Sequence, residues 1–159
     1  DRDGLWDALN DDRIDIIATD HAPHTLEEKA QHYTKAPSGG PMVQHALPVM
    51  LECVQRGKIT LEKVVEKMCH NPAILFDIEH RGYIREGYFA DLVLVDTQQT
   101  QTITRDNVLY KCGWSPLEGT TLRGVVTLTR RNGDIVYAWL LYTSPSPRDT
   151  IRSRMPSAA

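Results

Sequence analysis

A short apolar, β-branched run that stops abruptly at ionisable residues constrains the fold of this chain most. The run is IDIIAT, residues 14–19, and the segment that follows it is DHAPH, residues 20–24. Such a run predicts a buried strand of a parallel sheet. Leu5, Trp6 and Leu9 precede it with the i, i+1, i+4 spacing of an amphipathic helix. A helix followed directly by a buried strand is typical of an α/β fold, whose ligands gather at the carboxyl ends of the strands.

Helical patterns follow this strand. Residues 43–54 are apolar on most sides and predict a buried helix, in which Pro48 is tolerated only within the first turn. Thr60 is a candidate N-cap for the next helix, and Asn71 with Pro72 predicts the start of a further short one. The apolar stripe of the helix after Thr60 has regular spacing and indicates packing; its members are Leu61, Val64, Val65 and Met68.

The pattern changes to β structure after Asp77. Strands are predicted over residues 90–96, 100–104, 121–130 and 134–139. Asn132-Gly133 between the last two is a strong hairpin signal. The sequence therefore divides into residues 1–76, the end of an α/β domain, and residues 77–139, a small β unit.

Composition excludes several classes of protein. The net charge is −3, so a basic nucleic-acid-binding surface is not expected. No apolar run approaches the roughly 18 residues of a membrane span. The cysteines are three and widely spaced, which argues against a disulfide framework or a cysteine zinc site and favours the cytoplasm.

Both ends of the chain are unusual. The chain begins at Asp1, without methionine and inside an expected helix, so we expect it to be the C-terminal part of a longer protein. Residues 140–159, LLYTSPSPRDTIRSRMPSAA, have neither helical nor strand periodicity. They resemble translated read-through of a sequencing adapter, and we treat them as a non-native tail.

The segment 20–24 carries the candidate chemistry. A carboxylate at the end of a buried strand can bind a metal or act as a general base, and an imidazole can be a ligand, an acid or base, or an anion donor. From these residues alone an ordinary turn, in which Asp20 caps backbone N–H groups, is an equally good interpretation.

A longer set of motifs favours the catalytic interpretation. IATDHAPHTLEEK closely resembles the signature of the dihydroorotase family, within the amidohydrolase superfamily. The resemblance extends over residues 1–138. It implies the C-terminal portion of a (β/α)8 metal-dependent hydrolase barrel plus part of a small β-sandwich domain. The further matching strings are APSGG, CHNPAILF, the stretch from Gly82 to Asp96, and KCGWSPLEGTTLRG.

The resemblance also implies roles for individual residues. Asp20 matches the aspartate that binds one metal and serves as general acid/base, and His24 matches the residue that holds the substrate carboxylate. Ser38 and Gly39 match loop positions that contact the substrate ring through backbone groups. We expect His21 to be a loop residue and not a ligand. The remaining histidines show no ligand spacing and are expected to be structural or solvent-facing: His32, His45, His70 and His80.

The implied activity is reversible hydrolysis of dihydroorotate to N-carbamoyl-aspartate in pyrimidine biosynthesis, by a metal-activated hydroxide in a homo-oligomeric, zinc-dependent parent enzyme. The family builds its metal centre from a His-x-His, a bridging lysine carboxylate or aspartate, and two further histidines. No His-x-His occurs in this chain. We therefore expect the chain alone neither to hold zinc nor to catalyse.

Two alternatives stay open at this point. One is a cyclic amidohydrolase of hydantoinase or dihydropyrimidinase type, against which His24 and the KCGWSPLEG string argue. The other is a non-catalytic dihydroorotase-like partner of a carbamoyltransferase, against which the intact Asp20 and His24 weigh.

Overall fold

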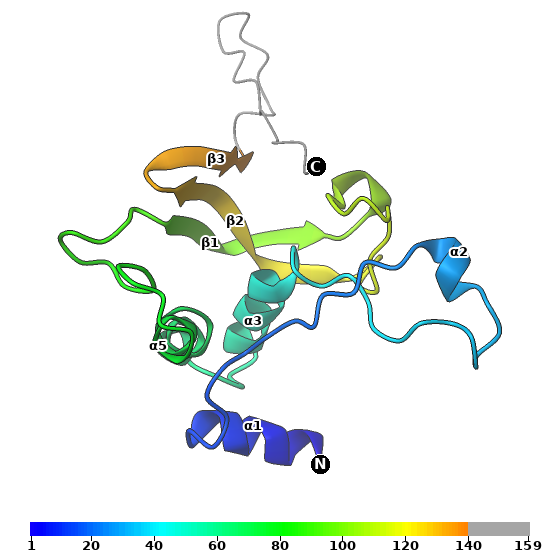
Figure 1. Ribbon diagram of the computed structural model, residues 1–159, viewed down its shortest axis with the longest axis horizontal. Helices are drawn as coiled ribbons and strands as arrows, with labels where there is room; N and C mark the ends of the chain where they lie inside the picture. Colours follow the sequence, from blue (N-terminus) through cyan, green and yellow to red (C-terminus); the bar gives the residue numbers. More distant parts are fainter. Residues whose placement is uncertain (140–159) are drawn as a thin grey trace, which may run out of the picture.

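The computed structural model describes residues 1–139, in which helices accompany a three-stranded antiparallel sheet (Figure 1). This mixture confirms the predicted α/β composition. The expected tail at 140–159 lies outside the described residues. The elements are α1 (Arg2–Asn10), α2 (Leu26–Lys29), α3 (Ala46–Gln55), α4 (Leu61–Val65), α5 (Asn71–Leu75), β1 (Leu92–Thr102), β2 (Thr121–Arg131) and β3 (Asp134–Ala138), with a π-helical turn at Glu66–His70 and a 3₁₀ turn at Arg105–Asn107.

The sheet has the order β1-β2-β3, and its hairpin is the one the sequence predicts. Asn132 and Gly133 connect β2 to β3 with φ values of 52° and 89°. Two successive residues with positive φ are characteristic of the type I′ turn, whose twist matches that of the paired strands. The local Asn-Gly signal thus fixes the register of the hairpin.

The two strands expected at 90–96 and 100–104 are one strand, β1. Its register against β2 shifts between Asp96 and Thr100. Asp96 Oδ1 accepts the backbone N–H groups of Gln98 at 2.9 Å and Gln99 at 3.1 Å, so its carboxylate stabilises the irregular turn. The interruption seen in the sequence is therefore a bulge within a strand and not its end.

Thr60 caps α4 as predicted, because its hydroxyl accepts the N–H of Lys63 at 3.2 Å. The short helix expected at Asn71 is present as α5, but Asn71 is not its N-cap, because helical backbone runs into it from the π-helical turn. A π-helical turn precedes Pro72, and the N–H of Asn71 bonds to Glu66 O, five residues earlier. The side chain of Asn71 donates instead to Asp15 O at 2.7 Å. The wider turn accommodates a proline that would otherwise disrupt the α-helical ladder.

The strand expected at residues 14–19 is also not found. This segment has no regular secondary structure, and Ile17 N–H donates to Lys67 O on the neighbouring helix. The nearest sheet-like pairing is an isolated parallel bridge between His21 and Gly40. A strand is completed by hydrogen bonds from a neighbouring strand, and residues 1–139 place none beside this run.

Helix α3 packs against β2, as Figure 1 shows. Pro48 occupies its third position, inside the first turn as required. The contact is close because β2 carries Gly124, where a Cβ atom would lie 2.6 Å from the Cβ of Leu51. Leu51 and Val125 are almost completely buried there. A second apolar cluster joins α3 to α1 and α4 and consists of Leu9, Met50, Ile59 and Val64.

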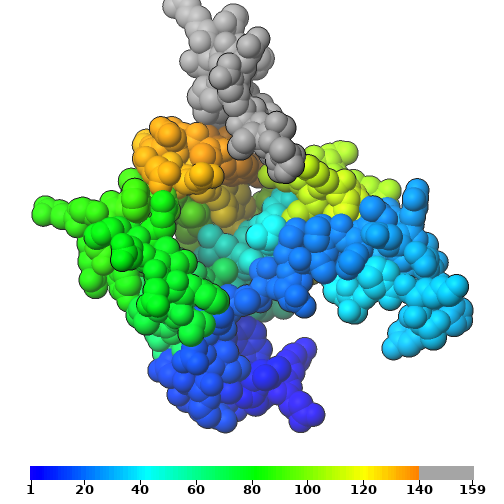
Figure 2. Space-filling view, viewed as in Figure 1, coloured from blue at the N-terminus to red at the C-terminus, as the bar shows by residue number. Residues whose placement is uncertain are grey.

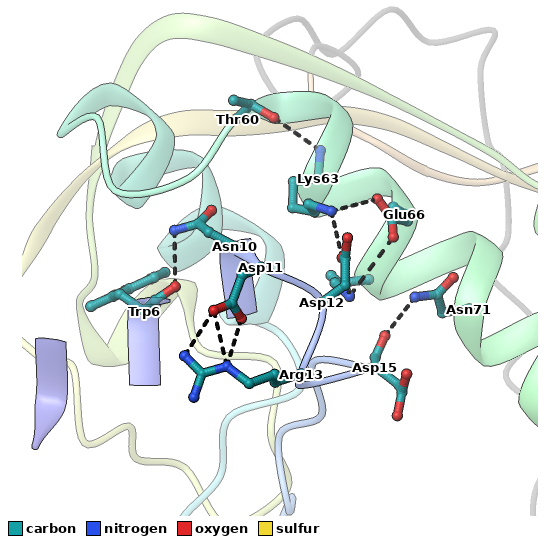
Figure 3. Close-up of polar contacts among 11 residues, drawn as sticks. Trp6, Asn10, Asp11, Asp12, Arg13, Asp15, Thr60, Lys63, Glu66 and Asn71 are labelled. Carbon is teal, nitrogen blue, oxygen red and sulfur yellow. Dashed lines mark hydrogen bonds and ion pairs between the residues drawn. The ribbon is translucent and has the colours of Figure 1, made fainter. Parts of the chain in front are cut away.

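An ionic cluster connects the end of α1 to α4 and the π-helical turn (Figure 3). Asp12, which follows α1 with φ 66°, lies 2.5 Å from Lys63 Nζ and 2.9 Å from Lys67 Nζ. These two hydrogen bonds lower the pKa of Asp12 from 3.8 to about 2. Lys67 is only 1% exposed, so the carboxylate of Asp12 compensates a buried cation. The cluster fixes where the chain leaves α1 toward Asp20.

No helix within residues 1–139 is both long enough and apolar enough to cross a membrane.

Candidate functional site

Asp20 is exposed and occupies a left-handed backbone conformation, with φ 44°. A non-glycine residue in this region is uncommon, and strain of this kind gathers at functional sites. The next residues are fixed by the loop 36–45, because Ala22 N–H donates to Gly40 O at 3.0 Å beside the bridge at His21. The segment that presents Asp20 is therefore attached to the APSGG loop by backbone bonds.

Gly39 allows this attachment. Its φ is 84°, and a Cβ atom there would lie 2.7 Å from the Cβ of Ala22. Lys29 Nζ holds the same loop from α2 by donating to Pro37 O at 2.7 Å and to Gly39 O at 3.0 Å. Ser38 lies exposed between these two anchored carbonyls. The structure thus brings Ser38 and Gly39 next to the segment that carries Asp20.

His24 is half-buried and fixed through its backbone. Trp114 Nε1 donates to His24 O at 2.7 Å, while His24 Nδ1 lies 3.7 Å from Glu28 Oε2. Glu28 belongs to a capping box with Thr25, whose backbone and side chain lower the pKa of Glu28. The imidazole of His24 therefore lies beside the carboxylate that Thr25 holds in the capping box, and its ring nitrogens can hydrogen-bond an anion.

His21 has a defined role in holding the loop. Its Nδ1 accepts the backbone N–H groups of Met42 at 3.1 Å and Val43 at 3.3 Å. Its ring centroid lies 5.2 Å from that of Tyr110. The imidazole therefore connects the DHAPH segment to the loop 36–45 and to Tyr110, which immediately precedes the KCGWSPLEG string.

A further residue of the site, Tyr110, was not predicted from the sequence. Tyr110 Oη accepts the N–H of Gln44 at 2.9 Å and lies 3.3 Å from His45 Nδ1, which is 3.2 Å from Ser115 Oγ. His45 is 4% exposed, and burial lowers its pKa; burial likewise raises the pKa of Tyr110. His45 is thus structural, as expected. The KCGWSPLEG string pointed to the region, but no sequence signal singled out Tyr110.

Three segments far apart in the sequence therefore meet at one place: residues 20–24, 36–45 and 107–116. Figure 2 shows the first and third as adjoining blue and yellow-green surfaces. Gly40 contributes to the junction, because a Cβ there would lie 3.7 Å from the ring of Trp114 and 3.6 Å from Pro116. The four predicted site residues belong to two of these three segments.

The metal-binding capacity of this region is limited. The carboxylate of Asp20 is a donor that suits zinc. Across residues 1–139, however, no three His, Cys, Asp or Glu side chains come together in an arrangement that could hold a metal ion. Since a zinc site takes three or four ligands, the described residues do not build one by themselves.

Known proteins share this sequence and architecture. The chain is 46% identical over 118 residues to a dihydroorotase of Halobacterium salinarum, covering 74% of this chain and 28% of that protein. It is 41% identical over 136 residues to a dihydroorotase of Pyrococcus furiosus, covering 86% and 31%. A solved D-hydantoinase from Thermus sp. superposes with a TM-score of 0.81 at 27% identity, over 87% of this chain and 31% of that one.

The chain spans about a third of the length of the curated relatives it matches. The model of the amidohydrolase family matches residues 1–136, nearly all of the part that the structure describes. The resemblance noted in the motifs is therefore confirmed by similarity over most of the chain, and the chain belongs to the amidohydrolase family.

Proposed function

We propose that this chain is the Asp20-bearing part of a dihydroorotase, which reversibly hydrolyses the ring amide of dihydroorotate to N-carbamoyl-aspartate. The observation that carries the proposal is the junction of the segments holding Asp20, His24 and Gly39, through the Ala22–Gly40 and Trp114–His24 hydrogen bonds. The identity of 41–46% to two dihydroorotases supports this substrate over a hydantoin, since the Thermus hydantoinase is 27% identical.

Asp20 is proposed as the proton carrier. Opening a cyclic amide requires removal of a proton from the attacking water and delivery of one to the leaving nitrogen. The carboxylate of Asp20 is exposed and can perform both transfers in turn.

His24 is proposed to bind the substrate carboxylate. A ring N–H of an imidazole can donate a hydrogen bond to such a group, and the half-buried ring of His24 lies 3.7 Å from the carboxylate of Glu28. Ser38 and Gly39 are proposed to contact the ring through their backbone. Glycine at position 39 permits close approach of the main chain. Lys29 fixes the loop through its hydrogen bonds to Pro37 O and Gly39 O.

Zinc is the proposed metal, with Asp20 as the ligand that this chain supplies. A bound zinc ion would supply Lewis acidity and ease the ionisation of water at the site. The remaining ligands are proposed to come from parts of the full-length enzyme outside this chain. The 159-residue chain alone is accordingly proposed to be inactive.

The proposed architecture follows the same family relationship. Residues 1–76 are assigned to the end of a (β/α)8 barrel and residues 77–139 to part of a small β-sandwich domain. The D-hydantoinase superposition supports this assignment at the level of overall fold. The three cysteines are all unpaired, which supports the cytoplasm as the proposed compartment.

The test is the substrate preference of the full-length protein that contains this chain. We expect kcat/KM for dihydroorotate to exceed that for hydantoin by at least about 100-fold, because the substrate carboxylate that His24 binds is absent from hydantoin. His24→Ala should remove most of this preference by raising KM for dihydroorotate. A preference for hydantoin would favour the hydantoinase alternative, and the absence of turnover on both would favour a non-catalytic partner.

A further inference from the structure

Three consecutive backbone N–H groups in the loop 36–45, just after its APSGG string, are bound by side chains from other segments. His21 Nδ1 accepts from Met42 and Val43, and Tyr110 Oη accepts from Gln44. Loops ordinarily direct such groups to water or to their own residues. Here the acceptors come from positions 21 and 110, on either side of the loop in sequence.

The side chain of Gln44 strengthens the attachment to the third segment. Its Nε2 donates to Asn107 O at 2.7 Å, and its Oε1 accepts the N–H of Leu109 at 2.8 Å. Each of these bonds contributes modestly to stability, and leaving a partly buried N–H unpaired costs more than one such bond contributes. The loop is therefore held in one conformation by several modest bonds that act together.

The two acceptors also touch each other and reach the candidate catalytic residue. The rings of His21 and Tyr110 are tilted by 43° with centroids 5.2 Å apart. The buried His45 lies next to Tyr110. Its Nδ1 is within hydrogen-bond distance of both the Tyr110 hydroxyl and the Ser115 hydroxyl. His21 is bonded covalently to Asp20. A shift of the loop 36–45 would thus move Ser38 and Gly39, and it would also disturb the segment that carries the carboxylate of Asp20.

We propose that His21 and Tyr110 are positioning residues, which together hold the loop containing Ser38 and Gly39 in its substrate-binding shape. This proposal rests on the proposed function, because it assumes that this loop contacts dihydroorotate. Neither side chain needs to touch substrate or metal. Their effect is exerted through the backbone N–H groups of residues 42–44, so it should appear in KM more than in kcat.

The experiment compares variants in the full-length protein that contains this chain. His21→Ala removes the acceptor for two N–H groups and should raise KM for dihydroorotate about tenfold, with kcat changing less than threefold. His21→Asn places an amide oxygen where Nδ1 stands and should restore KM to within about threefold of wild type. Tyr110→Phe should raise KM about fivefold, and its effect should not add fully to that of His21→Ala.

Tyr33→Phe is the matched control, since it removes the same hydroxyl from a ring that is 92% exposed. Hydrogen exchange of the amides at 42–44 supplies a readout independent of activity. Faster exchange together with higher KM in His21→Ala and Tyr110→Phe is the expected result. Unchanged exchange, or faster exchange with unchanged KM, would overturn the proposal.

The same measurements separate the two claims. If the wild-type protein does not hydrolyse dihydroorotate, the proposed function fails, while exchange at 42–44 still decides whether the two side chains hold the loop. If the wild type is active and His21→Asn behaves like His21→Ala, the acceptor role of His21 is wrong although the proposed function stands.

Discussion

Gly39 lies so close to Ala22 that a Cβ atom at position 39 would stand 2.7 Å from the Cβ of Ala22. The φ of Gly39 is 84°, a backbone conformation that residues with a side chain rarely adopt. The loop with Ser38 and the segment with Asp20 thus come into contact at Gly39, where the loop has no side chain. The candidate site depends on this approach as much as on its polar groups.

Gly39→Ala is therefore expected to separate the two segments. The methyl group cannot fit beside Ala22, so the loop must shift, and we expect KM for dihydroorotate to rise at least about tenfold in the full-length protein. Gly119→Ala is the control, because Gly119 has φ 82° but no atom within 4 Å of an added Cβ. Gly119→Ala should have the backbone strain without a steric clash, and its KM for dihydroorotate should equal that of the wild type. Equal KM values in the two variants would contradict the account.

Gly124→Ala is expected to destabilise the contact between α3 and β2. The added Cβ would lie 2.6 Å from the Cβ of Leu51, which is buried. Overpacking of this kind together with strain at φ 106° should lower the free energy of unfolding by about 2–3 kcal/mol, measured by urea denaturation. Gly4→Ala, within α1 and with open space around it, should instead raise that free energy by about 0.5–1 kcal/mol.

The ionic cluster at Asp12 predicts a pH dependence of stability. Hydrogen bonds from Lys63 and Lys67 lower the pKa of Asp12 to about 2. The stabilisation is therefore complete above the unfolded value near 3.8 and is lost as the pH falls toward 2. Asp12→Asn should be less stable than wild type at pH 5, and the difference should become much smaller by about pH 2, where the carboxyl of Asp12 is partly protonated. A difference at pH 2 as large as that at pH 5 would show that the carboxylate charge is not its source.

The 159-residue chain should not bind zinc stoichiometrically. Asp20 is proposed to supply one ligand, and residues 1–139 contain no group of three donors that could complete a site. Equilibrium dialysis at micromolar zinc should give less than one bound ion per chain, and Asp20→Asn should not change this value. Binding of two ions per chain would show that the chain builds the metal centre alone.

Features set by neighbouring residues were predictable, and those set by distant partners were not. The Asn132-Gly133 hairpin and the Thr60 cap follow from local backbone chemistry and are confirmed. The run at 14–19 carries a strand pattern but lacks a neighbouring strand within residues 1–139. At Asn71 a π-helical turn lets one helix continue past Pro72, which no local rule indicates.

The same distinction holds at the site. Asp20, His24, Ser38 and Gly39 were proposed because short strings around them resemble a known family, and the structure brings their segments together. Tyr110 could not be proposed, because its importance comes from contacts with Gln44 and His45, about 65 residues away in the chain. The roles of the four predicted residues stay predictions.

The most direct test of the account is kcat for dihydroorotate in Asp20→Asn of the full-length protein. Asparagine tolerates the left-handed backbone at this position, so the fold should be retained with an unchanged melting temperature. It cannot carry a proton, and kcat should fall by about 10²- to 10⁴-fold. A folded Asp20→Asn variant that keeps kcat within about threefold of wild type would contradict the central claim that Asp20 moves the proton in this reaction.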